Sequence, residues 1–179
     1  MPKLSCSYFS NVFRLLLGLG LGLVLFAQFA SAQYSKQGIE LVRIFDGDSA
    51  LVRVEGETLH VRLVGIDAPE KGQPHADASR DQFVDYLKAP SARLEILKRD
   101  VFRRWLVRVE VEGQDLGEKL LSDGNAWFFR RYQADLSPEM RRRYDRAERD
   151  AQKNKRGLWQ ESSPMAPWDY RATKRKARD

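Results

Sequence analysis

The stretch 61–70 places one cation and two carboxylates at fixed spacing. Arg62 lies in an alternating apolar run typical of a strand, and Asp67 and Glu70 lie on either side of Pro69 after a glycine. Proline fixes its own φ and pushes the preceding residue into an extended conformation, so this exit from the strand is rigid and not helical. Opposite charges held rigidly at a strand end indicate a site that processes a polyanion.

The elements that must position these residues begin with three short apolar runs, separated by acidic-glycine turns. The runs are 41–45, 50–54 and 59–64, and their turns contain Asp46-Gly47-Asp48 and Glu55-Gly56-Glu57. This pattern predicts an antiparallel meander. By the two-residue strand period, Arg62 lies on the face opposite to Leu59, Val61 and Leu63 and need not enter the core.

The rest of the pattern predicts two more strands and three helices. The strands are 92–97 and 105–111. The helices are 77–87 with Asp77 as a possible cap, 116–123 ended by Gly124, and one that starts after the cap Ser137 with Pro138 in its first turn and ends at Gly157. Five strands with a helix between the third and fourth predict a mainly β, α+β fold: a five-stranded OB-type barrel with three α-helices.

The two ends of the chain have their own patterns. Residues 1–32 have a basic start, an apolar run and the small-x-small sequence Ala30-Ser31-Ala32, which predicts a signal peptide cleaved after Ala32 and a secreted or periplasmic domain at 33–160. No stable membrane span remains after cleavage; the alternative is an uncleaved N-terminal membrane anchor. Residues 161–179 form a tail with prolines and a tryptophan, then basic residues; its aromatics are expected to dock, and its last eight residues to lack order.

Composition limits the chemistry of the exported domain. The only cysteine, Cys6, lies in the predicted signal peptide, so neither a disulfide nor thiolate chemistry is expected. The first 32 residues hold two basic and no acidic side chains, so the net charge of +6 falls to +4 after cleavage. This mild positive charge is compatible with nucleic acid but does not establish it.

Several separated motifs together resemble the staphylococcal nuclease-like (thermonuclease) family. The resemblance runs from about residue 41 to 159. Its most specific part is the Arg-x-x-x-x-Asp-x-Pro-Glu spacing of residues 62–70, and even the sequence of residues 167–171 is similar to tails of bacterial members. The other motifs are Asp46-Gly47-Asp48-Ser49, Asp100-Val101-Phe102-Arg103-Arg104, Gly124-Asn125-Ala126-Trp127 and Arg156-Gly157-Leu158-Trp159.

The resemblance implies a monomeric, calcium-dependent endonuclease that cleaves DNA and RNA and leaves 3′-phosphate ends. Asp48, Asp67 and the backbone carbonyl of Ala68 would hold the metal ion. All three are hard oxygen donors of the kind that Ca²⁺ prefers. Zinc is disfavoured, because the chain has only two histidines, His60 and His75, and no thiol remains.

The resemblance also assigns the catalytic and nucleic-acid-binding residues. Arg62 and Arg104 would clamp the scissile phosphate, and Glu70 would be the general base or the group that orients the attacking water. Phe102 and Tyr132 would contact the nucleic acid. Without a metal ion, three carboxylates against two arginines would repel a phosphodiester, so this charge count predicts that the metal ion is needed for binding as well as for chemistry.

The chain departs from the family pattern at several positions. Arg103 replaces a glycine that commonly precedes the second arginine, so the turn is expected to differ and Arg103 to compete with Arg104 for the phosphate. Phe102 and Arg130 each replace a tyrosine, and Ala68 replaces a hydroxyl residue.

One alternative from another class stays open: an OB-type module that binds nucleic acid without cutting it. The presence of all five charged residues of the predicted site favours the nuclease.

Overall fold

The computed structural model describes residues 34–177, and the compact unit to which they belong begins at Gln33. The predicted signal peptide lies outside the described residues. None of the helices between residues 34 and 177 is long and apolar enough to cross a bilayer.

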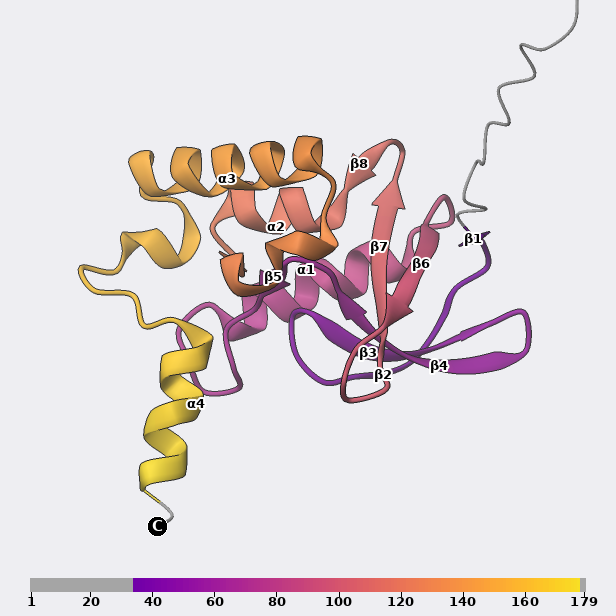
Figure 1. The fold of residues 1–179 in the computed structure, drawn as a ribbon, viewed down its shortest axis with the longest axis horizontal. Coiled ribbons are helices and arrows are strands. Elements are labelled where there is room, and N and C mark those ends of the chain that lie inside the picture. The colour runs from indigo at the N-terminus through magenta and orange to yellow at the C-terminus, as the bar shows by residue number, and fades with distance from the viewer. Residues whose placement is uncertain (1–33, 178–179) are drawn as a thin grey trace, which may run out of the picture. The chain divides into compact units, whose positions relative to one another are not determined.

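Five strands of the larger sheet follow the order of an OB fold. They are β2 (Glu40–Ile44), β3 (Ser49–Val54), β4 (Glu57–Leu63), β6 (Arg93–Arg99) and β7 (Trp105–Val111). Their order in the sheet is β2, β3, β4, β7, β6, so the third of the five pairs with the fifth (Figure 1). That pair is parallel and the others are antiparallel. The predicted α+β class and OB-type architecture are confirmed, with this parallel pair added to the antiparallel pattern.

Four shorter strands go beyond the prediction. They are β1 (Tyr34–Lys36), β5 (Ile66–Asp67), β8 (Gln114–Asp115) and β9 (Trp127–Phe128). Strands of two or three residues are too short to show alternation, which is why the sequence pattern does not reveal them. β5 and β9 form a sheet of their own in which Asp67 lies opposite Trp127, so this pairing fixes the backbone at a predicted catalytic carboxylate.

The three predicted helices are present as α1 (Ala76–Lys88), α2 (Leu116–Asp123) and α3 (Pro138–Lys153). Ser137 caps α3 by accepting a hydrogen bond from the backbone of Met140 at 3.2 Å, as predicted. α3 ends at Lys153 with Asn154 as its C-terminal cap, not at Gly157, because Lys155 has a left-handed φ of 51° with which the helix cannot continue. α2 and α3 pack against each other, and α1 contacts β2.

The start of α1 differs from the prediction. His75, with a left-handed φ of 64°, precedes the helix, and Asp77 lies within its first turn. The cap position is therefore two residues before the predicted one. A carboxylate in the first turn still interacts favourably with the helix dipole, so Asp77 does mark the start of the helix.

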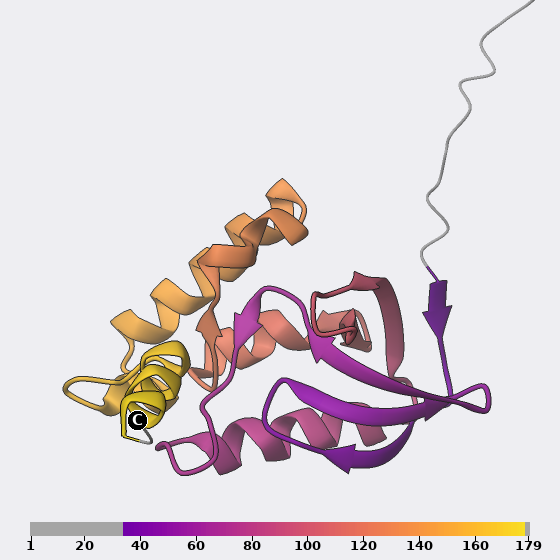
Figure 2. The same cartoon turned by 60° about the horizontal axis from the view of Figure 1, so that its bottom comes forward.

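A fourth helix, α4 (Pro167–Lys176), corrects the prediction of three helices and, as far as residue 177, the prediction of a final segment without order. Residues 178–179 of that segment lie outside the described residues. Pro167 occupies its first turn, Asp169 its N-terminal end and Lys174 its C-terminal end, which suits both the backbone and the helix dipole. Figure 2 shows α4 beside the loop that follows β5. Low hydrophobicity and high charge suggested disorder, but docking of the helix outweighs this composition.

Gly124 lies where the end of α2 meets the chain after α3. Its φ is 72°, and a Cβ there would stand 2.1 Å from the carbonyl oxygen of Arg156. We expect Gly124→Ala to lower the free energy of unfolding by about 1–3 kcal/mol beyond the cost of the left-handed conformation, which is itself about 1–2 kcal/mol. Gly56→Ala is the matched control, because its φ is 83° and nothing lies within 4 Å of the new Cβ. Urea unfolding that shows equal losses for both variants would contradict the tight packing at Gly124.

Candidate active site

Arg62 lies at the centre of a cluster of buried charges. One of its terminal nitrogens donates to Asp48 Oδ1, and the other donates to Asp67 Oδ1 at 3.0 Å and to the carbonyl of Ile66 at 3.2 Å. The side chains of Asp48 and Asp67 are 2% and 1% exposed, and that of Arg62 is 13% exposed. One guanidinium therefore binds two desolvated carboxylates, Asp48 in the turn before β3 and Asp67 in β5.

The hairpin of β3 and β4 brings Asp48 to Arg62. Ser49 pairs with Arg62 across the two strands, so the residue before Ser49 lies at the mouth of the hairpin beside the arginine. The side chain of Asp46 shapes the turn by accepting hydrogen bonds from the backbone nitrogens of Asp48 at 3.0 Å and Ser49 at 2.7 Å.

Ala68 lies next to Asp48 although twenty residues separate them. Its backbone nitrogen donates to Asp48 Oδ2 at 2.9 Å. The pairing of β5 with β9 holds Asp67 just before it. The structure thus brings together the three residues predicted to hold a metal ion.

Glu70 lies at the rim of this cluster on the rigid segment after Pro69. Its backbone nitrogen donates to the side chain of Gln73 at 2.8 Å, and its carbonyl accepts from the backbone of Gln73 at 2.9 Å, so the loop closes on itself. The Glu70 side chain is 31% exposed, which leaves it accessible to water.

Arg171, on α4, is a residue of this site that the sequence analysis missed. It donates to Asp67 Oδ2 and to Glu70 Oε1, both at 2.6 Å, and to Asp67 Oδ1 at 3.2 Å. Burial lowers its pKa, but the hydrogen bonds to the two carboxylates raise it further, so the net pKa is above the ordinary value and the side chain is a fixed cation. The only signal in the sequence was the similarity of residues 167–171 to bacterial tails.

Arg104 lies at the end of the turn between β6 and β7. Its hydrogen bonds go to Asp100 and not to the carboxylates of this cluster. Its guanidinium donates to Asp100 Oδ2 at 2.9 Å, and its backbone nitrogen donates to Asp100 Oδ1 at 2.9 Å. Burial raises the pKa of Asp100, but these bonds outweigh it and lower the pKa overall. His60 shares a face of β4 with Arg62. Burial and, to a smaller extent, the charge of Arg104 lower the pKa of His60.

Arg103 takes up the left-handed conformation that a glycine would adopt at its position. Its φ is 64°, at a cost of about 1–2 kcal/mol for a residue with a side chain. The sequence predicted a different turn shape at this position. The structure shows instead that Arg103 adopts the backbone conformation typical of glycine. Arg103 is exposed, whereas Arg104 is half-buried and held by Asp100.

The two predicted nucleic-acid contacts are both exposed aromatic residues. Phe102 is 74% exposed at the tip of the turn, with the guanidinium of Arg104 5.4 Å from its ring centroid. Tyr132 is 48% exposed and meets Phe129 edge to face at 5.1 Å. Both rings offer surface on which a base can stack.

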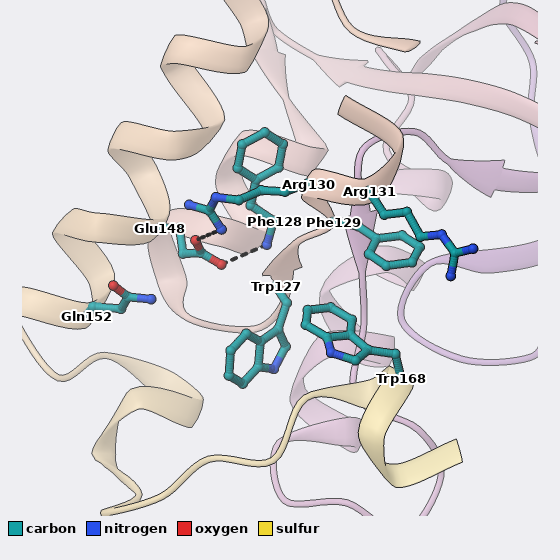
Figure 3. A pocket seen from close by; sticks show the side chains of 8 residues that line it. All are labelled: Trp127, Phe128, Phe129, Arg130, Arg131, Glu148, Gln152 and Trp168. Carbon is teal, nitrogen blue, oxygen red and sulfur yellow. Dashed lines mark hydrogen bonds and ion pairs between the residues drawn. The ribbon is translucent and has the colours of Figure 1, made fainter. Parts of the chain in front are cut away.

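Arg130, which stands where the family has a tyrosine, binds α3. It pairs with Asp145 and with Glu148 Oε2, each at 2.7 Å, and the buried Glu148 also accepts from the backbone of Phe128 at 2.8 Å. Figure 3 shows Arg130 and Glu148, with Trp127 and Trp168, among the side chains that line a cavity of about 360 Å³. Arg130 therefore has a structural role between β9 and α3.

The donor set can be tested for a divalent cation. Asp48 and Asp67 offer carboxylate oxygens that share the Arg62 guanidinium, and the Ala68 backbone nitrogen contacts Asp48. Three carboxylates including Glu70 outnumber the two guanidinium groups of Arg62 and Arg171. Among residues 34–177 no three histidine, cysteine or acidic side chains are grouped closely enough to hold a metal ion. Backbone oxygen and water would have to complete the shell, as is usual for hard cations. The residues present fit such an ion.

Burial strongly affects the protonation of this cluster. It raises the pKa of Asp48 well above the ordinary value, and the ion pair with Arg62 opposes this rise. Burial lowers the pKa of Arg62, but Asp48 and Asp67 more than compensate, so it ends above the ordinary value. The arginine therefore stays charged.

Comparison with known proteins gives consistent matches. The model of the family described as "Staphylococcal nuclease homologue" matches residues 60–161. The chain is similar to a probable staphylococcal-like nuclease of Oryza sativa subsp. japonica, with 35% identity over 118 residues that cover 66% of this chain and 30% of that protein. An uncharacterized endonuclease of Escherichia coli O157:H7 is 30% identical over 136 residues, 75% of this chain and 84% of that protein. A micrococcal nuclease of Shigella flexneri is 29% identical over 147 residues, covering 77% and 82%. The chain thus spans less than a third of the rice protein.

Proposed function

Because the chain belongs to the staphylococcal nuclease homologue family, we propose that it is an exported, calcium-dependent endonuclease. It hydrolyses phosphodiester bonds of DNA and RNA as a monomer and leaves 3′-phosphate ends. The names of relatives from Escherichia coli and Shigella flexneri, an endonuclease and a micrococcal nuclease, support the activity. The basic start, the apolar run and Ala30-Ser31-Ala32 in the sequence support export with cleavage after Ala32.

The observation that carries this proposal is the buried cluster of Asp48, Arg62 and Asp67 with Glu70 at its rim. Desolvating two carboxylates is costly, and the arginines paired with them, Arg62 with both and Arg171 with Asp67, only partly compensate that cost. A protein with no use for such charges would be more stable with apolar residues there. The cluster is therefore better explained by chemistry than by stability.

Asp48, Asp67 and the Ala68 carbonyl would hold the calcium ion, which when bound supplies positive charge for a phosphate oxygen and lowers the pKa of a bound water. In the structure the Arg62 guanidinium donates to both carboxylates. The same N–H groups match the spacing of two phosphodiester oxygens. They would donate hydrogen bonds to the scissile phosphate when the substrate binds.

Glu70 takes the proton of the attacking water. The water oxygen forms a bond to phosphorus while the bond from phosphorus to the 5′ oxygen breaks, and the leaving oxygen gains a proton from solvent. The phosphate then stays on the 3′ side. Negative charge grows on the phosphate during this step, so the guanidinium of Arg62 binds the transition state more strongly than the ground state.

The purified protein, incubated with plasmid and with a 5′-labelled single-stranded oligonucleotide in calcium, is expected to fragment both. Treatment with a phosphatase that removes 3′-phosphates should slow the labelled products in a sequencing gel, because they lose charge. Products that phosphatase does not alter would contradict the proposed 3′ ends. Binding that weakens with salt, with no fragments in any condition, would instead establish a non-catalytic binding module.

A further inference from the structure

The C-terminal helix places a cation in front of the catalytic carboxylates. Arg171 contacts both oxygens of Asp67 and one oxygen of Glu70, with its two terminal nitrogens at 2.6 Å from Asp67 Oδ2 and Glu70 Oε1. More than 100 residues separate Arg171 from either carboxylate. This contact therefore depends on how α4 docks and not on local chain geometry.

α4 is anchored by contacts that do not involve Arg171. Trp168 stacks on Phe129 with ring centroids 5.3 Å apart and planes 13° apart, and it meets Trp127 edge to face at 5.7 Å (Figure 3). Just before the helix, the carbonyl of Met165 accepts from the side chain of Gln73 at 2.9 Å. Aromatic packing and this hydrogen bond hold the helix on the loop that carries Glu70, so Arg171 reaches the carboxylates already positioned.

A divalent cation and Arg171 cannot both take Asp67 in this arrangement. Oδ1 already receives Arg62 at 3.0 Å and Arg171 at 3.2 Å, and Oδ2 receives Arg171 at 2.6 Å. Calcium binds carboxylate oxygens at about 2.3–2.6 Å, a distance at which it would stand beside a guanidinium nitrogen of like charge. Binding of the ion requires Arg171 to move away from Asp67.

We propose that Arg171 is the resident cation of the site and that calcium must displace it, so that α4 sets the calcium concentration at which the site is loaded. This inference rests on the proposed function, because it takes Asp67 as a ligand of the ion. The same displacement releases Glu70, whose carboxylate is held by Arg171 in the absence of the ion. Loading of the site and release of the general base are thereby coupled through one side chain.

The test is a calorimetric titration of calcium into the purified protein without nucleic acid, comparing the wild type with Arg171→Ala, Arg171→Lys and Arg175→Ala. Arg175→Ala is the matched control, because it removes the same charge from an exposed position on the same helix. We expect Arg171→Ala to lower the dissociation constant for calcium about tenfold, as the repulsion of a nearby charge is relieved. Lysine cannot form the bidentate fork and should give an intermediate value, and the control should change it less than about twofold.

The inference would be overturned if Arg171→Ala bound calcium no more tightly than the wild type does. It would also be overturned if Arg171→Ala and Arg175→Ala had the same dissociation constant for calcium. Slower cleavage by Arg171→Ala at saturating calcium with an unchanged dissociation constant would also overturn it, and would place Arg171 on the substrate. Tryptophan fluorescence checks that Trp168 stays docked. Tighter calcium binding by a variant that cleaves nothing would leave the inference standing and refute the nuclease proposal, whereas no calcium binding by any variant would refute both.

Discussion

Arg62→Ala is expected to lower the rate of phosphodiester cleavage by about 10³–10⁵, the range seen when a phosphate-clamping arginine is removed from other phosphoryl-transfer enzymes. The reason is that its guanidinium would bind the scissile phosphate; within residues 34–177 it is the one side chain paired with both Asp48 and Asp67. The same change leaves two buried carboxylates with less compensation, since Asp48 loses its arginine and Asp67 keeps only Arg171. We therefore also expect a loss of about 3–5 kcal/mol in the free energy of unfolding, measured by urea unfolding.

Two control variants separate these effects. Arg62→Lys keeps the charge but loses the planar fork, so it should recover stability more than activity. Arg53→Ala removes an arginine from the neighbouring strand, where its pair with Glu40 is largely exposed, and should change stability by about 1 kcal/mol or less. Cleavage by a folded Arg62→Ala protein within tenfold of the wild type would exclude Arg62 from phosphate binding.

Glu70→Gln is expected to slow cleavage by about 10²–10⁴ while leaving the fold intact, because it removes the proton acceptor and keeps the shape of the side chain. Glu70 is half-exposed, so its replacement costs little in stability. Single-turnover cleavage of a labelled oligonucleotide measures the chemical step.

Asp77→Asn serves as the control for the loss of one negative charge near the site, since Asp77 is exposed in the first turn of α1. This variant should cleave at the wild-type rate. Unchanged cleavage by Glu70→Gln would show that another group accepts the proton.

Much of the site was predictable because its parts lie on strands and tight turns. Alternation placed Arg62 on the face of β4 opposite Leu59, Val61 and Leu63, and the predicted meander paired β3 with β4. The register of Ser49 opposite Arg62 shows how this pairing brings Asp48, which only the resemblance had assigned to the site, beside the arginine. Proline stiffening of the segment from Asp67 to Glu70 kept the two carboxylates near the same point. Local rules suffice where neighbouring strands bring the residues together.

The contribution of α4 was beyond such rules. A ten-residue helix with a highly charged second half has little tendency to form alone, and its order depends on Trp168 meeting aromatic residues from β9 and the turn after it. Composition therefore suggested disorder, and Arg171 was hidden in a run of basic residues. Without a metal ion the site still holds three carboxylates against two arginines, but the second arginine is Arg171, since Arg104 is paired with Asp100.

Arg103 shows a different limit of the sequence. A non-glycine residue at a position that commonly has glycine suggested another turn, yet the backbone keeps φ at 64° and the arginine bears the strain. The side-chain oxygens of Asp100 hold the turn in place by accepting three hydrogen bonds, two from backbone nitrogens and one from the Arg104 guanidinium. These bonds compensate the strain of the left-handed conformation, and the residue types alone do not predict that they form.

Cleavage of plasmid DNA by one sample of the purified protein, first in excess EDTA and then after calcium is added beyond the chelator, tests the proposed chemistry most directly. The predicted result is no detectable nicking in EDTA and rapid fragmentation once free calcium is present, because three carboxylates otherwise face the phosphodiester without a divalent cation. Substantial cleavage in excess EDTA, or none after calcium is restored, would contradict it.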